Sequence, residues 1–206
     1  MSAPREIVVA TGNPHKVEEI RAILGPSGLV VRSLDEVGGA CPEPDETGRT
    51  FEANARIKAV AYAKATGRTV LADDSGLEVD ALGGEPGVDS AIWAGAHGTR
   101  AERDARNNVK LAERMRGIPA DRRSARFVCC MCLADSAGRV LAETRGAFEG
   151  RIGDAPRGSH GFGYDPWLWL DDAGCSSAQL SPQAKNARSH RGHAARAMVE
   201  AIRMLG

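Results

Sequence analysis

Short apolar runs typical of strands alternate loosely with amphipathic helices, and this order limits the possible folds more than any other feature. The segment REIVVATGNPHKVEEIRAILG has β-branched residues at 7–9, followed by apolar residues at helical spacing until Gly25. Residues 29–34 predict a second strand. An Ala-rich helix is predicted to follow at residues 50–66, with Thr50 as its N-cap and Gly67 as its stop.

The rest of the chain continues this mixture. Residues 69–84 predict a strand, a turn at Ser75–Gly76 and another strand, and residues 99–117 predict a helix. A β-hairpin is expected from ARFVCCMCLAD and VLAETRGAFEGRI, then a strand at 165–170 and a C-terminal helix capped by Ser189. Because strands and helices do not alternate strictly, the sequence predicts an α/β fold with a mixed sheet flanked by helices. A length of 206 residues suits one large domain or two small lobes that share a core.

The balance of charge restricts the partners. Lys and Arg together number 27, as do Asp and Glu, which argues against nucleic acid or an anionic membrane as the main partner. No stretch approaches the roughly 20 apolar residues of a membrane span, and the apolar run at 7–10 is too short for a secretory signal. Five cysteines without such a signal favour a cytoplasmic protein. Cys129, Cys130 and Cys132 fit a buried strand better than a metal or redox site.

Two adjacent carboxylates, Asp73 and Asp74, follow the apolar run at 70–72. Neighbouring strand residues point to opposite faces, so we expect one carboxylate to face a crevice and the other to be tied to backbone or solvent. Asp74 is the better candidate to protrude and hold Mg²⁺, with a second ligand from the acidic loop at 35–49, which carries Glu43, Asp45 and Glu46. The alternative is a pair of turn-forming aspartates.

The segment ATGNPHK lies between a strand and a helix, where free backbone N–H groups and the helix dipole favour anions. Gly12 allows close approach, Thr11 and Asn13 can donate hydrogen bonds, and Lys16 adds charge one turn into the helix. The pattern is not a Walker phosphate loop, so an ordinary strand-to-helix turn is the alternative.

Three further groups of residues have functional alternatives. In RGSHGFGYDPW, glycines around Phe162 and Tyr164 leave room for a flat ligand to stack, although this stretch alone slightly favours a turn with Phe162 in the core. Cations gather in LSPQAKNARSHRG, where a solvated helix start is the default. Asn54 and Lys58 share one helix face at i and i+4, which is also compatible with plain surface residues.

Together these segments resemble the inosine triphosphate pyrophosphatase family. The matching stretches are TGNPHK, ETGRTFEANARIKA, LADDSGLEVDALGGEPGVDSA, GFGYDP and SHRGHA, in the family's order from residue 11 to residue 194. The resemblance implies one pyrophosphatase domain over 1–206, with two lobes around an elongated sheet and a central cleft. It further implies a homodimer and Mg²⁺-dependent hydrolysis of ITP, dITP or XTP to the monophosphate and pyrophosphate, with water attacking the α-phosphorus.

The resemblance also implies residue roles. Asp74 and Lys58 would be catalytic, and Glu46 and Asp74 would hold the metal. Phe162 would stack on the purine. The remaining substrate-binding positions would be Thr11, Gly12, Asn13, Pro14, His15, Lys16, Asn54, Ser75, Gly163, Tyr164, Asp165, Lys185, His190 and Arg191, of which Pro14 and His15 occupy variable loop positions.

Selectivity for deaminated purines needs a donor to the 6-oxo group, and Arg191 is the residue we expect to supply it.

Two rival functions remain. One is a related pyrophosphatase acting on pyrimidine or modified nucleotides. The other is a nucleotide-binding protein without catalysis, which the presence of Glu46, Asp74 and Lys58 disfavours.

Overall fold

A computed structural model describes residues 6–38 and 41–205, so two residues of the predicted acidic loop, 39 and 40, lie outside the described part. The chain divides into two compact units. Unit 1 comprises Met1–Asp74, Cys129–Gly146 and His190–Gly206, and unit 2 comprises Ser75–Val128 and Ala147–Ser189. Each unit has a hydrophobic core of its own.

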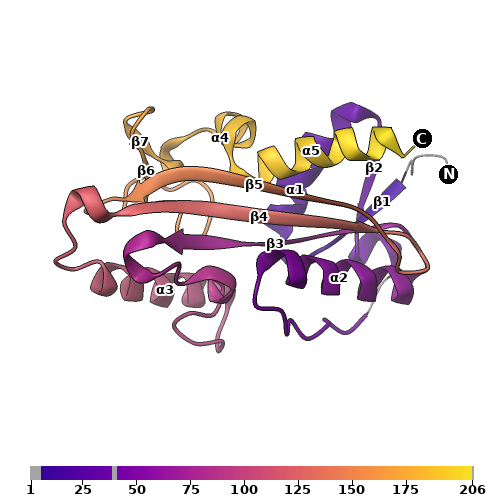
Figure 1. Cartoon of the computed structure of the whole chain (residues 1–206), viewed down its shortest axis with the longest axis horizontal. Coiled ribbons are helices and arrows are strands. Elements are labelled where there is room, and N and C mark those ends of the chain that lie inside the picture. Colours follow the sequence, from indigo (N-terminus) through magenta and orange to yellow (C-terminus); the bar gives the residue numbers. More distant parts are fainter. Residues whose placement is uncertain (1–5, 39–40, 206) are drawn as a thin grey trace. The chain divides into compact units, whose positions relative to one another are not determined.

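Within residues 6–38 and 41–205, seven strands are connected in the order β2-β1-β3-β4-β5-β6-β7 (Figure 1). β1 pairs in parallel with β2 and β3, whereas β6 pairs antiparallel with β5 and β7, so the predicted mixed α/β fold is confirmed. The strands are β1 (Glu6–Ala10), β2 (Val30–Ser33), β3 (Val70–Val79), β4 (Ser124–Ala134), β5 (Val140–Ile152), β6 (Leu168–Leu170) and β7 (Cys175–Ser176). The α-helices are α1 (Pro14–Leu24), α2 (Phe51–Thr66), α3 (Arg100–Arg114), α4 (Pro182–Arg188) and α5 (His190–Met204).

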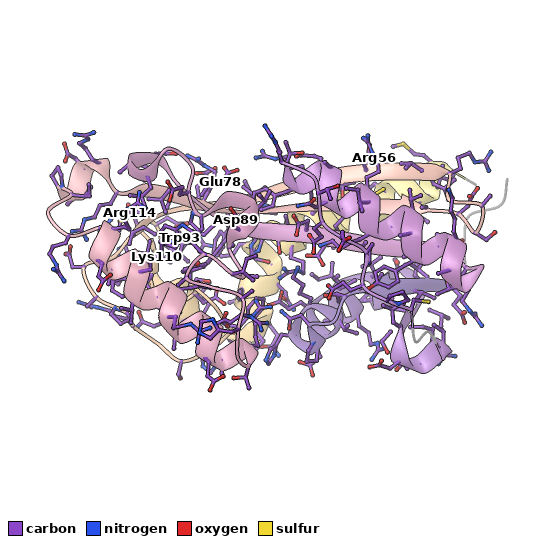
Figure 2. The ribbon with its side chains drawn as sticks, turned by 90° about the horizontal axis from the view of Figure 1, so that it is seen from below. Arg56, Glu78, Asp89, Trp93, Lys110 and Arg114 are labelled. Atoms are coloured by element: carbon purple, nitrogen blue, oxygen red, sulfur yellow. The ribbon has the colours of Figure 1, made fainter. Side chains whose placement is uncertain are left out.

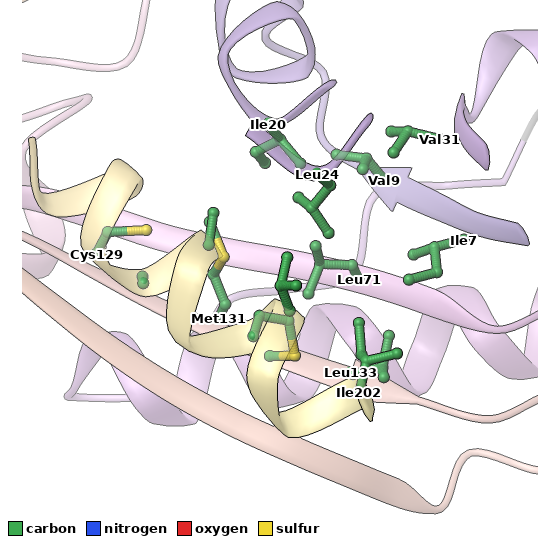
Figure 3. Close-up of a cluster of buried hydrophobic side chains, with 14 of the residues drawn as sticks. Ile7, Val9, Ile20, Leu24, Val31, Leu71, Cys129, Met131, Leu133 and Ile202 are labelled. Atoms are coloured by element: carbon green, nitrogen blue, oxygen red, sulfur yellow. The ribbon is translucent and has the colours of Figure 1, made fainter. Parts of the chain in front are cut away.

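In unit 1, helices α1 and α5 cover one face of the strands and α2 lies on the opposite face (Figure 1). Alternate residues of β1, β3 and β4 point into the core beneath α1 and α5, as period-2 strands require (Figure 3). Each fully buried Leu or Ile there contributes roughly 1.5–3 kcal/mol. The labelled members of this core are Ile7, Val9, Ile20, Leu24, Val31, Leu71, Cys129, Met131, Leu133 and Ile202.

The bounds predicted for α2 are confirmed by its caps. The Thr50 hydroxyl accepts a hydrogen bond from the Ala53 N–H at 3.2 Å, which satisfies a free donor of the first turn. Gly67 ends the helix in the left-handed conformation with φ +64°, where a side chain would be strained. The helix thereby presents Asn54 and Lys58, one turn apart, as buried polar residues.

The turn predicted at Ser75–Gly76 is wrong, because β3 runs without interruption from Val70 to Val79. A Cβ at Gly76 would lie 2.2 Å from Ser90 Oγ and 2.6 Å from the Gly87 carbonyl oxygen. The lack of a side chain at Gly76 therefore lets the segment with Gly87 and Ser90 approach β3 closely, and Gly76 does not reverse the chain. Asp74 consequently lies within the strand, not at its end.

The core of unit 2 is built from β3, β4, β5, β6 and α3, and includes Leu77, Leu111 and Phe148. A capping box between Thr99 and Glu102 begins α3. Near its other end, Lys110 and Arg114 lie against the Trp93 ring, 4.5 and 5.8 Å from its centroid (Figure 2).

The strand predicted at 165–170 is shorter in the structure, where β6 covers Leu168–Leu170, and β7 was not predicted. Among the described residues, no helix combines the length and apolarity that a membrane crossing requires.

Candidate functional site

In unit 1, two carboxylates meet at one ammonium group. Lys58 Nζ lies 3.1 Å from Asp74 Oδ1 and 3.0 Å from Glu46 Oε2. The Asn54 amide accepts from the Gly48 N–H at 2.8 Å and donates to Asp74 Oδ2 at 3.3 Å. The site therefore joins the middle of β3, one face of α2 and the acidic loop. It brings together two pairs that the sequence indicated, Asp74 with Glu46 of the acidic loop and Asn54 with Lys58.

Electrostatics in this cluster favour an added cation. Burial raises the pKa of Asp74, the negative charge of Glu46 raises it further, and Lys58 opposes both. For Lys58, burial acts to lower the pKa, but the charges of Asp74, Asp73 and Glu46 outweigh it and the pKa is raised. A carboxylate that is costly to ionise beside a second carboxylate is stabilised when more positive charge arrives.

Asp73 points to the other face of β3 and lies in a buried ionic network. Its Oδ2 is 3.0 Å from Lys16 Nζ and 3.4 Å from Arg191 Nη2, and Arg191 also pairs with Glu19. Burial acts to raise the pKa of Asp73, but Lys16 and Arg191 hold it well below its usual range. The expected separation of the two aspartates is confirmed, but Asp73 is tied to side chains of α1 and α5 and not to backbone or solvent.

The Thr11–Asn13 turn leads into α1 as predicted. Asn13 caps the helix by accepting from the His15 N–H at 3.1 Å, and Thr11 Oγ1 accepts from the Asn13 N–H at 3.2 Å. Among the described residues, the buried Asn13 Nδ2 has no hydrogen-bond partner. A buried donor left without an acceptor is costly, and an incoming anion would satisfy it.

In unit 2, Asp165 organises the glycine-rich loop. Its carboxylate accepts from the Phe162 N–H at 2.9 Å and from Ser177 Oγ at 2.7 Å, and it pairs with Lys185 Nζ at 2.7 Å. Gly161 has φ +78°, and a Cβ there would lie 2.1 Å from Asp165 Oδ2. The loop therefore needs glycine at this position, and Lys185 is held 5.2 Å from the centroid of the Phe162 ring.

Phe162 is half-buried and lies outside the core cluster, whereas Tyr164 is inside it. The Tyr164 hydroxyl donates to the Ser90 carbonyl at 3.0 Å, and burial raises the pKa of this phenol well above its usual range. Tyr164 thus supports the loop from within the core, and Phe162 is the aromatic residue of this loop that remains partly accessible.

Sequence reasoning missed the part of α3 that holds this loop. Asp104 Oδ2 accepts from the Gly163 N–H at 3.2 Å, and Asn108 Nδ2 donates to the Gly163 carbonyl at 3.1 Å. The i, i+4 spacing of Asp104 and Asn108 places both on one face of α3, but that signal does not name the partner. Glu19, which pairs with Arg191, was also missed, because its position on α1 does not indicate a partner on α5.

The other predicted residues fall in one unit or the other. Pro14 and His15 open α1, and His190 is buried at the first position of α5. Ser75 follows Asp74 in β3 and is half-buried. Arg191 is only 1% exposed and engaged by Glu19 and Asp73, and its contact with a purine stays a prediction.

The cysteines of β4 are buried, which disfavours their reactivity. Burial raises the pKa of Cys129, Cys130 and Cys132, which disfavours the thiolate needed for metal or redox chemistry. Among the described residues, no group of three or more His, Cys, Asp or Glu side chains is placed to hold a metal ion. A cation in unit 1 would therefore rest on two carboxylates.

The fold and the site together define a class of protein. It is an α/β protein with two paired carboxylates in one unit and a glycine-rich loop with an aromatic residue in the other. The model of the Ham1 family matches residues 7–201, and the chain belongs to this family. The resemblance seen in the motifs is thereby confirmed.

Named relatives agree over nearly the full chain. A dITP/XTP pyrophosphatase of Nitratidesulfovibrio vulgaris is 51% identical and covers 94% of both chains. Another, of Exiguobacterium sibiricum, is 47% identical and covers 96% of both. Among solved structures, a HAM1 protein from Coxiella burnetii has a TM-score of 0.85 at 37% identity, covering 97% of this chain and 98% of its own.

Proposed function

We propose that this chain hydrolyses non-standard purine nucleoside triphosphates, namely ITP, dITP and XTP, to the monophosphate and pyrophosphate. The observation that carries the proposal is the convergence of Asp74 and Glu46 on Lys58 Nζ, at 3.1 and 3.0 Å, in a chain whose relatives are named dITP/XTP pyrophosphatases. Removing such nucleotides would keep deaminated purines out of DNA and RNA.

The donor set of unit 1 suits Mg²⁺. Asp74 and Glu46 offer only oxygen ligands, which Mg²⁺ prefers, and two carboxylates are enough for an ion that keeps several waters and shares substrate phosphates. When bound, the metal would supply a positive charge that polarises phosphate oxygens and lowers the pKa of water.

The chain's own residues would do the rest. A triphosphate carries about four negative charges near neutrality, and phosphoryl-type transfer depends mainly on positioning and charge stabilisation. Lys16, Asn13 Nδ2 and the first turn of α1 would bind phosphate oxygens, and Lys58 would neutralise charge near the reacting phosphorus. Asp74 would accept a proton from the attacking water.

In unit 2, the Phe162 ring would stack on the purine. Base–aromatic stacking contributes on the order of 1–3 kcal/mol and tolerates any base, so it gives affinity without selectivity. Lys185, fixed by Asp165 beside the ring, would add positive charge at the base and phosphates.

The test is turnover of ITP with Mg²⁺ in water enriched in ¹⁸O, with products identified by mass spectrometry. Attack at the α-phosphorus places the label in IMP and leaves pyrophosphate unlabelled. Labelled pyrophosphate would move the attack to the β-phosphorus. Release of inorganic phosphate and IDP would refute the proposed reaction, and a panel with pyrimidine triphosphates would expose the rival substrate class.

A cytoplasmic homodimer, which the family resemblance implies, is also part of the proposal. Sedimentation velocity of the full chain should give a single species of about 44 kDa, twice the 21.8 kDa of one chain. A species of one chain's mass across micromolar concentrations would remove the dimer from the proposal without affecting the reaction.

A further inference from the structure

A second cation, besides Lys185, lies over the Phe162 ring in unit 2, and no motif of the sequence pointed to it. The Arg100 guanidinium carbon is 5.5 Å from the centroid of the Phe162 ring. Arg100 is the first residue of α3, where the helix dipole disfavours a cation. Helix formation therefore gives no reason for an arginine at this position.

Arg100 and Lys185 differ in their freedom to meet a ligand. The Lys185 side chain is 5% exposed and held by the buried Asp165 at 2.7 Å. The Arg100 side chain is 40% exposed, and its Nε makes an i, i+4 pair with Asp104 at 3.1 Å. Pairs of this kind contribute little, so Arg100 can reorient cheaply. Among the described residues, the two terminal Nη groups make no hydrogen bond or ion pair, so their donors are available to a ligand.

Asp104 also connects Arg100 to the loop. One of its oxygens pairs with Arg100, and the other accepts from the N–H of Gly163, the residue after Phe162. One carboxylate thus contacts both the arginine and the backbone of the loop that carries the Phe162 ring. A base stacked on Phe162 would displace the guanidinium from the ring toward the edge of the base.

In addition to the contact expected from Arg191, we propose that Arg100 is a specificity-determining residue, whose Nη groups donate to O6 and N7 of a 6-oxopurine stacked on Phe162. Guanidinium forks make this bidentate contact with 6-oxopurines, and a good pair discriminates by about 10-fold or more. Adenine offers an amino donor at position 6 and would be disfavoured. The inference rests on the proposed function for its ligand class and concerns unit 2 alone.

Binding of nucleoside monophosphates tests this without requiring turnover. Calorimetric titration would compare IMP, AMP and purine riboside 5′-monophosphate, which lacks the 6-oxo group, against the wild type, Arg100→Gln and Arg100→Lys. Arg103→Gln is the matched control, because Arg103 lies on the same helix but donates to the Gly98 carbonyl. Circular dichroism would verify that each variant is folded.

We expect the wild type and Arg103→Gln to bind IMP at least about 10-fold more tightly than the other two ligands. Arg100→Gln should lose about 10-fold for IMP and little for purine riboside monophosphate, and Arg100→Lys should fall in between. An equal loss of affinity for all three ligands in Arg100→Gln would overturn the proposal. It would mean that Arg100 contributes to binding through stacking or charge and does not recognise O6. Unchanged IMP affinity would overturn it too. Selective IMP binding that depends on Arg100 in a protein that fails to hydrolyse ITP would refute the proposed function alone.

Discussion

At the scale of single residues, the adjacent carboxylates Asp73 and Asp74 have different tasks because they point to opposite faces of β3. The sequence was enough to separate them, since strand periodicity alone places neighbours on opposite faces. It was not enough to name their partners. Lys16 and Arg191 are far from Asp73 along the chain, and only the packing of α1 and α5 on one face brings them to it.

Asp74→Asn should abolish turnover. The substitution keeps the size of the side chain but removes the negative charge that faces Lys58 and the proposed metal, so kcat/KM for ITP should fall by at least about 10²-fold. Steady-state kinetics with excess Mg²⁺ would measure this, with circular dichroism as a check of folding. Near-normal activity in this variant would remove Asp74 from the catalytic site.

Asp73→Asn should destabilise the fold. Breaking a buried pair by removing one partner costs about 3–5 kcal/mol. In this variant the largely buried Lys16 would lose the Asp73 carboxylate, and Arg191 would lose one of its acidic partners. Chemical denaturation would measure the change in the free energy of unfolding. Glu143→Gln, which breaks the exposed Arg56–Glu143 pair (2.8 Å) on the same unit, is the matched control and should have little effect. Equal effects of the two variants would contradict the role of the buried network.

The same network predicts how stability depends on pH. The folded pKa of Asp73 lies below its unfolded value of about 3.9, so its contribution is fully present above about pH 4. It is lost as the pH falls through the folded pKa, because protonation must then break the pairs with Lys16 and Arg191. The free energy of unfolding should therefore decrease below about pH 4, and this decrease should be smaller in Asp73→Asn.

At the scale of elements, helix ends could be predicted and the continuity of β3 could not. Thr50, Gly67 and Thr99 cap or stop their helices through contacts with their immediate neighbours, so a short window of sequence contains the whole signal. The Ser75–Gly76 pair has the composition of a turn, but Gly76 is required by Gly87 and Ser90, which approach from a later segment. No window around residue 76 carries that information.

Gly76→Ala should therefore destabilise unit 2. The added Cβ would meet Ser90 Oγ at 2.2 Å and the Gly87 carbonyl at 2.6 Å, and overpacking of this kind costs about 1–3 kcal/mol. Gly25→Ala is the control, because Gly25 has helical φ −53° and a Cβ added there would meet nothing within 4 Å. That variant should be neutral or slightly stabilising. Equal stability of both variants would contradict the close approach at Gly76.

At the scale of the whole molecule, β3, β4 and β5 each contribute residues to both units, although each unit has its own core. The mixed fold class was predictable from the order of elements, but the division into units was not, because it depends on where each strand changes its packing partners. All three tryptophans of the chain, at 93, 167 and 169, lie in unit 2. Tryptophan fluorescence therefore reports unfolding of unit 2 alone.

Leu71→Ala should lower the unfolding midpoint seen by tryptophan fluorescence, although Leu71 lies in the core of unit 1. Truncating a fully buried leucine costs about 2–5 kcal/mol, which shifts Tm by about 2–4 °C per kcal/mol in a chain of this length. Because the strands are shared, we expect fluorescence and far-UV circular dichroism to give one coincident transition, as they should for Leu77→Ala in unit 2. Val109→Ala, at a position 59% exposed on α3, should move neither signal. A fluorescence midpoint that stays constant in Leu71→Ala while dichroism shows an earlier transition would mean that the two units unfold independently.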